Sequence, residues 1–164
     1  LAEIAQDFSL LADIGVQGLE PIKLARVIEE VTGLYQIGED QVSWDITGFG
    51  DDVVVRGSFP HLLRVFNNLI SNAIHALVKT ANKEIRITCE RRDDGWQIAI
   101  HDNGSGIDDS QIEKVFQPHF TLKREGAGLG LTITRSVVNQ LGGSIEVSKL
   151  HDDWTTFVIW FPKG

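Results

Sequence analysis

Two glycine clusters within residues 102–131 constrain the fold of this chain more than any other part of its sequence. The first cluster, at residues 104–106, follows an alternating apolar run that predicts a β-strand ending at Asp102. The second cluster, at residues 126–130, leads into an apolar pattern of helical period. Glycines at the start of a helix leave backbone N–H groups available to bind a phosphate. An aspartate at one end and a phosphate site at the other therefore suggest a bound nucleotide.

Asn68 and Asn72 form a third polar feature, on a segment whose periodicity predicts a helix from Ser58, as its N-cap, to about Thr80. Residues four apart project from one helical face. Two amide oxygens there suit a Mg²⁺ ion whose coordination phosphates complete. On an isolated helix, two such asparagines are explained more simply as part of a solvent-exposed face. Beside the two glycine clusters the sequence favours the magnesium site.

Four blocks follow one another along the chain: NLISNAIHAL, DNGSGI, VFQPHF and GAGLGLT. They resemble the N box, first glycine box, F box and second glycine box of the catalytic and ATP-binding domain of sensor histidine kinases, and look most similar to the nitrogen-regulation type. The resemblance spans residues 20–162 and implies the Bergerat ATP-binding (GHKL) fold. We therefore expect an α/β two-layer sandwich, in which about three helices cover a mixed, mostly antiparallel sheet of about five strands.

The resemblance implies ATP and Mg²⁺ as ligands. It assigns Asp102 as the acceptor for the adenine amino group, with Thr155 beside it and Thr156 as the alternative. The implied metal ligands are Asn68 and Asn72, and the implied catalytic residues are Asn68, Asn72 and Lys123. The residues implied to bind ATP are Asn72, His75, Asp102, Gly104, Gly106, Ile107, Phe120, Lys123, Arg124, Gly126, Gly128, Leu129, Gly130, Leu131 and Thr155.

The segment between the glycine clusters is identified by the same resemblance as a lid over ATP. Its polar composition and flanking glycines predict that it moves. Phe116 and Phe120 are expected to anchor it to the domain. His119 stands where an aromatic residue is usual in the family, and we interpret it as a tolerated ring substitution. Cationic residues just before the second cluster can meet the terminal phosphates.

The amide of Asn68 bears on the type of reaction. In gyrase-like ATPases the matching position is a Glu that activates water, and an amide lacks the basicity for that role. The sequence therefore favours phosphoryl transfer over hydrolysis. The implied activity is phosphorylation of a histidine on the kinase's own dimerisation hairpin, with later transfer to a response regulator. An anti-sigma-type serine kinase and a nucleotide-sensing module without catalysis are the alternatives.

Residues 1–17 carry apolar side chains at three- and four-residue spacing, which predicts an amphipathic helix. This helix either packs on the domain or, as the resemblance implies, is the tail of the dimerisation and phosphoacceptor hairpin. We favour the second interpretation, which divides the chain into residues 1–19, the tail and linker, and residues 20–164, the ATP-binding domain. The absence of a starting Met predicts a piece of a longer chain, and the resemblance implies that this chain is a homodimeric kinase whose acceptor histidine lies upstream.

The other elements follow from local patterns. Pro21 is expected in the first turn of a helix that ends at Tyr35. Two short strands are expected next, joined by a Gly-Phe-Gly turn, and two strand pairs later in the chain. These strands are expected at residues 42–47, 52–57, 83–91, 96–101, 144–148 and 155–161.

A net charge of −8 argues against nucleic acid or an anionic membrane as a partner. No apolar run approaches the ~18 residues that a membrane span needs. The lone Cys89 cannot form an internal disulfide, which fits a reducing compartment. Together with the resemblance, these features imply a cytoplasmic domain, without direct membrane contact, of a protein in the bacterial inner membrane.

Overall fold

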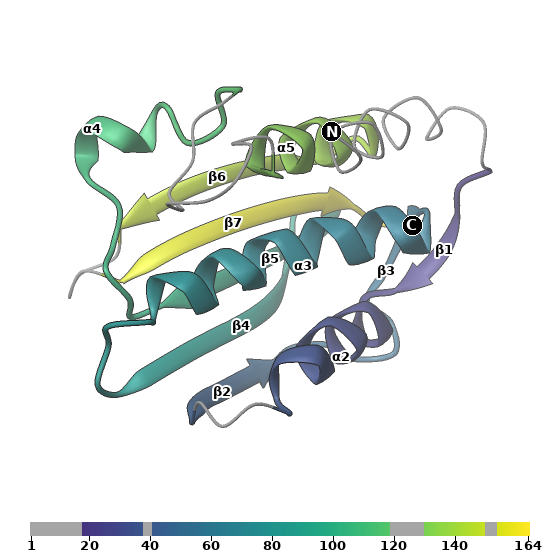
Figure 1. Cartoon of the computed structure of the whole chain (residues 1–164). Helices are drawn as coiled ribbons and strands as arrows, with labels where there is room; N and C mark the ends of the chain where they lie inside the picture. Colours follow the sequence, from purple (N-terminus) through teal and green to yellow (C-terminus); the bar gives the residue numbers. More distant parts are fainter. Residues whose placement is uncertain (1–17, 38–40, 119–129, 150–153) are drawn as a thin grey trace.

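The computed structural model describes residues 18–37, 41–118, 130–149 and 154–164. These residues form two layers, in which helices cover one face of a five-stranded sheet (Figure 1). The main helices are α2 (Leu24–Tyr35), α3 (Phe59–Ala76) and α5 (Gly130–Gln140). In sheet order, the strands are β2 (Val42–Thr47), β4 (Lys83–Arg92), β5 (Gly95–Asp102), β7 (Thr155–Pro162) and β6 (Ser144–Lys149). Within this sheet β2 and β4 pair in parallel and the other pairs are antiparallel, so the predicted mixed, mostly antiparallel sandwich is confirmed.

Apolar residues at every second position of the strands form the sheet face that packs against the helices. Every second residue in the middle of β4 and β5 points into the core, including Ile85, Ile87, Ile98 and Ile100, each at most 1% exposed. Burying such apolar faces is the main stabilising term of a two-layer domain. The facing stripe of α3 is equally buried, and consists of Leu62, Val65, Phe66, Leu69 and Ile70. This packing holds α3 over the sheet, with its C-terminal end beside the end of β5 (Figure 1).

The expected helix start at Pro21 is wrong. Residues Glu20–Lys23 form a short strand, β1, which pairs antiparallel with β3 (Val54–Gly57), and α2 begins only at Leu24. Ile22 is buried in this ribbon while its neighbours are exposed, so the segment is held by one apolar anchor and by pairing with β3. Proline is compatible with a short edge strand as well as with a first helical turn.

The strands at residues 42–47 and 54–57 form close to where the sequence predicts them, but they do not pair with each other. The first joins the five-stranded sheet and the second pairs with β1. The long helix α3 ends at Ala76, earlier than expected, where the N–H of Ser105 donates to the Ala76 carbonyl at 3.0 Å. None of the helices in the described part of the chain is long and apolar enough to cross a membrane.

Candidate functional site

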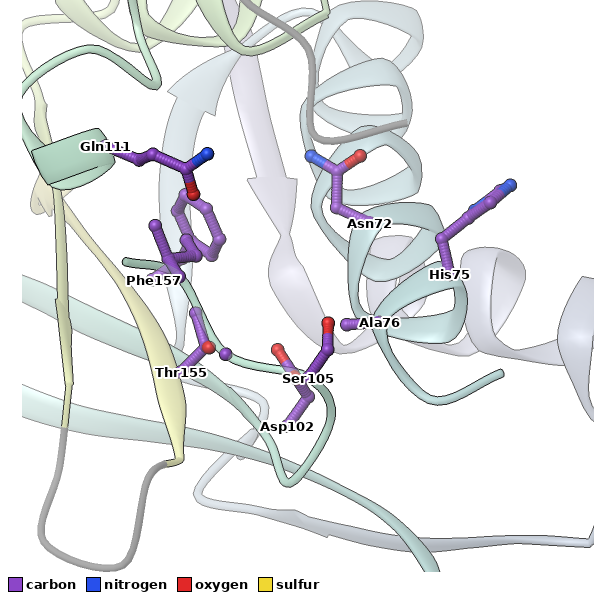
Figure 2. Close-up of a pocket in the computed structure, with 10 residues that line it drawn as sticks. Asn72, His75, Ala76, Asp102, Ser105, Gln111, Thr155 and Phe157 are labelled. Atoms are coloured by element: carbon purple, nitrogen blue, oxygen red, sulfur yellow. The ribbon is translucent and has the colours of Figure 1, made fainter. Parts of the chain in front are cut away.

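A pocket of about 300 Å³ opens where the end of α3, the loop after β5 and the start of β7 meet (Figure 2). Asn72 and Gln111 lie on opposite sides of it, and Asp102 and Thr155 lie together away from them. The lining residues are Asn72, His75, Ala76, Asp102, Ser105, Gly106, Ile107, Gln111, Thr155 and Phe157. Six of the residues proposed from the sequence are therefore brought together here: Asn72, His75, Asp102, Gly106, Ile107 and Thr155.

Asp102 is a buried carboxylate at the last position of β5, with only 3% of its surface exposed. Burial raises the pKa of this carboxyl from 3.8 to about 6, because desolvation penalises the charged form. The Gly104 N–H donates to Asp102 Oδ1 at 3.0 Å and opposes that shift only in part. At neutral pH the pocket therefore holds an ionised acceptor with little solvation.

Thr155 pairs with Asp102 across β5 and β7, so both side chains point into the same pocket. Its hydroxyl oxygen is buried and has no hydrogen-bond partner within the described residues. A buried polar atom without a partner is costly, which makes this hydroxyl available to a ligand or a water. The next residue, Thr156, faces the other side of the sheet and lies 2.8 Å from His101 Nδ1. Of the two threonines considered from the sequence, only Thr155 lines the pocket.

The two glycines of the first cluster serve different purposes. Gly106 lines the pocket and has a φ of +75°, a conformation that residues with a side chain rarely adopt. Gly104 does not line the pocket. A Cβ added to Gly104 would lie 2.5 Å from the carbonyl oxygen of Ala76, so this glycine allows the loop to pack against the end of α3. At Gly104 the structure thus shows a contact within the protein, and the part of this glycine in binding ATP stays a prediction.

The two asparagines of α3 also differ. Asn72 lines the pocket, whereas the Asn68 side chain points toward α5, where its Nδ2 donates to Thr134 Oγ1 at 3.0 Å. His75 is exposed at the pocket rim, with its Nδ1 2.7 Å from the Ser71 carbonyl oxygen. Gly130, the first residue of α5, lies against Asn68 and outside the pocket lining.

Four lining residues were not singled out from the sequence as site residues: Ala76, Ser105, Gln111 and Phe157. Phe157 follows Thr155 by two positions, so strand alternation was a signal that it shares the same face. Gln111 belongs to the short helix α4 (Asp109–Ile112), and its Oε1 accepts the Asp108 N–H at 3.3 Å. Nothing in the local sequence distinguishes Gln111 from an ordinary capping residue.

The first part of the proposed lid is packed against the domain. Val115 is fully buried, and the Phe116 ring meets Phe157 edge-on at 6.3 Å between centroids. Thr132 Oγ1 donates to the Phe116 carbonyl at 3.1 Å, which ties this segment to α5. The anchoring expected of Phe116 is therefore present. Six of the residues proposed to bind ATP lie outside the described part of the chain: Phe120, Lys123, Arg124, Gly126, Gly128 and Leu129.

A metal here would depend on neutral ligands. No group of three or more His, Cys, Asp or Glu side chains suited to a metal occurs in residues 18–37, 41–118, 130–149 and 154–164. The nearby donors are amide oxygens of α3, which fit a Mg²⁺ that keeps several waters and is completed by phosphates. These amide oxygens therefore suit a Mg²⁺ ion that binds together with a nucleotide, and do not suit an ion that is bound permanently.

Residues 57–164 match the sequence profile of a family described as histidine kinase-, DNA gyrase B-, and HSP90-like ATPases. The chain belongs to this ATPase family. The match covers every described residue of the pocket, from the N box on α3 to the end of β7.

Similar proteins within this ATPase family include sensor histidine kinases. Sensor histidine kinase ZraS of Escherichia coli (strain K12) is 38% identical over 101 residues, covering 62% of this chain and 21% of ZraS. AtoS of the same strain is 33% identical over 146 residues, covering 87% of this chain and 24% of AtoS. The chain thus spans about a fifth to a quarter of the length of these relatives.

A solved structure of the catalytic domain of histidine kinase ThkA has the same fold, with a TM-score of 0.79 and 28% identity. The similarity covers 90% of this chain and 97% of the ThkA domain. The resemblance to the ATP-binding domain of sensor histidine kinases is therefore confirmed.

Proposed function

We propose that this chain binds ATP with Mg²⁺ and donates the γ-phosphoryl group to a histidine on the dimerisation hairpin of its own kinase. The observation that carries the proposal is the pairing of a buried, ionised Asp102 with the partnerless hydroxyl of Thr155 in one pocket. These two groups form a polar end for a base, within a pocket whose other walls include Ile107 and Phe157.

Asp102 selects adenine in this proposal. A carboxylate accepts a hydrogen bond from the exocyclic amino group of adenine, while guanine presents a carbonyl oxygen at that position. The Thr155 hydroxyl can donate to a ring nitrogen directly or through a water. Because Asp102 is desolvated, its bond to adenine is charge-assisted and replaces little hydration.

The phosphates would lie toward α3 and the start of α5. Gly130 and Leu131 open α5, where helix N–H groups lack internal partners and the helix dipole favours an anion. Asn72, with Asn68 behind it, would supply oxygen ligands to Mg²⁺, which neutralises phosphate charge. Neither amide can deprotonate water, so this chain positions and polarises the γ-phosphoryl group for an acceptor supplied elsewhere. Lys123 and Arg124 complete the proposed phosphate contacts.

The partners follow from the relatives. The matched proteins are sensor kinases, and ThkA has been solved in complex with the response regulator TrrA. We infer that residues 1–19 connect this domain to a dimerisation and phosphoacceptor hairpin, that the whole kinase is a homodimer, and that it phosphorylates a response regulator. We also place this domain on the cytoplasmic side of the bacterial inner membrane.

Radiolabelled transfer tests the proposal. Incubation with γ-labelled ATP and Mg²⁺ should leave residues 1–164 unlabelled and should label a longer chain that includes the hairpin, with acid-labile phosphate. The chain contains five histidines, of which His61 is 1% exposed and His101 lies on the sheet face opposite the pocket. Acid-stable phosphate on an added protein would indicate a serine kinase. ATP binding without transfer in the longer chain would indicate a sensing module.

A further inference from the structure

A buried hydroxyl on α5 contacts one of the two asparagines of α3. Thr134 is 1% exposed, and its Oγ1 accepts a hydrogen bond from Asn68 Nδ2 at 3.0 Å. The two residues lie 66 positions apart in the chain. Thr134 stands one turn after Gly130, so this bond ties the middle of α3 to the first turns of α5.

Gly130 confines the same side chain from a second direction. A Cβ atom on Gly130 would lie 2.6 Å from Asn68 Oδ1 and 2.7 Å from Asn68 Nδ2. Both ends of the carboxamide thus lie against the space that the missing side chain leaves. The carboxamide is held between Gly130 and Thr134, and its oxygen lies beside the first residue of α5.

The orientation of a carboxamide matters because its two ends differ chemically. The oxygen accepts hydrogen bonds and coordinates cations, whereas the NH₂ group only donates. A flip of the amide would replace a metal ligand with a group that repels the metal. Because Asn68 Nδ2 donates to Thr134 Oγ1, Oδ1 is the end of the carboxamide that is left to coordinate.

We propose that Thr134 is a positioning residue for magnesium: its hydroxyl holds Asn68 Nδ2, so that Asn68 Oδ1 is presented to the metal at the start of α5. This inference rests on the proposed function, because it needs Mg²⁺–ATP in the pocket. Thr134 itself touches neither the metal nor the nucleotide. Its effect is transmitted through Asn68.

Two variants of Thr134 distinguish the effect of its hydroxyl group from the effect of its packing. Thr134→Val keeps the shape of the side chain and removes the acceptor, whereas Thr134→Ser keeps the acceptor and removes a methyl group. Thr32→Val is a matched control, because Thr32 is also a buried helical threonine, and its Oγ1 donates to the Ile28 carbonyl at 2.8 Å in α2. Thr32 does not line the pocket.

The measurement is calorimetric titration with a non-hydrolysable ATP analogue, once with Mg²⁺ and once with EDTA. The readout is the gain in affinity that Mg²⁺ confers. We expect Thr134→Val to reduce this gain about threefold to tenfold, as for the loss of one hydrogen bond, with metal-free affinity nearly unchanged. Thr134→Ser should restore most of the gain, and Thr32→Val should leave it as in the wild type.

The outcomes distinguish this inference from the proposed function. An unchanged magnesium gain in Thr134→Val overturns the role of Thr134 while nucleotide binding stands. Equal weakening with and without metal also overturns it, because Thr134 would then only pack α5 against α3. If the wild-type chain binds no nucleotide, or gains nothing from Mg²⁺, the proposed function fails and this inference fails with it.

Discussion

The carbonyl oxygen of Ala76 would lie 2.5 Å from a Cβ atom on Gly104. Ala76 ends α3, and Gly104 stands two residues after the end of β5. The Ser105 N–H donates to the same carbonyl at 3.0 Å, so a helix end and a strand end are joined at one point. This junction sets the separation between Asn72 on α3 and Asp102 on β5, the two residues at opposite ends of the proposed nucleotide site.

Gly104→Ala should therefore destabilise the domain, because the new methyl group meets backbone that cannot move without shifting α3. We expect a loss of about 1–3 kcal/mol in the free energy of unfolding, measured by urea denaturation, together with weaker ATP binding. Gly33→Ala is the matched control, since a Cβ at Gly33 in α2 meets nothing within 4 Å. That variant should be neutral or more stable, by up to ~1 kcal/mol. Equal behaviour of the two variants would contradict the tight junction.

Asp102→Asn should weaken ATP binding and stabilise the protein without nucleotide. The loss of a charge-assisted bond to adenine should cost about 1.5–3 kcal/mol, at least tenfold in affinity by calorimetry. The folded-state pKa is raised to about 6 from 3.8, so at neutral pH the buried charge opposes folding. Its removal should raise the free energy of unfolding by about 1–3 kcal/mol. Unchanged affinity would remove Asp102 from the site.

ATP affinity should fall as the pH drops through about 6, where Asp102 becomes protonated in the protein without nucleotide. The stability of that protein should move in the opposite direction. Because the folded state binds the proton more tightly, stability should rise as pH falls from above 6 toward 3.8. Burial of His101, and to a lesser extent the charge of Arg86, also lower the pKa of the His101 ring. The effect of His101 titration must therefore be separated from that of Asp102. Asp102→Asn serves this purpose: a pH dependence of affinity that persists there would belong to other groups.

Asn72→Ala should weaken binding of Mg²⁺–ATP much more than binding of metal-free ATP. The reason is that Asn72 lines the pocket with an amide oxygen suited to the metal and makes no other proposed contact with the base. Paired titrations with Mg²⁺ and with EDTA measure the difference. If both forms weaken by the same factor, Asn72 shapes the pocket and does not hold the ion.

Much of the site could be predicted because its residues lie on strongly periodic elements. The alternation that ends at Asp102 and the one that begins at Thr155 place both residues on the core side of adjacent strands. The order of the four blocks then indicated which helix faces them. Family resemblance supplied the ligand, which periodicity alone does not identify.

The remaining features depend on contacts that local patterns do not contain. Strand β1 has one buried residue among its four, which is too few to show the alternation of a strand. Its Pro21 is also typical of the start of a helix. The role of Gly104 depends on where α3 ends in space. The bond from Asn68 to Thr134 joins two helices that pack only in the folded chain.

The anchored position of Phe116 has a consequence for the length of the loop around it. The chain between Asp102 and Gly130 is tied down at Phe116, through the Phe157 ring and the Thr132 hydroxyl. Residues 102–116 therefore close as a loop of their own, with its own entropy of closure. Doubling the length of a flexible loop costs only about 0.6 kcal/mol. Insertions or deletions on the α5 side of Phe116 are thus insulated from the Asp102 end of the pocket, which can keep its shape.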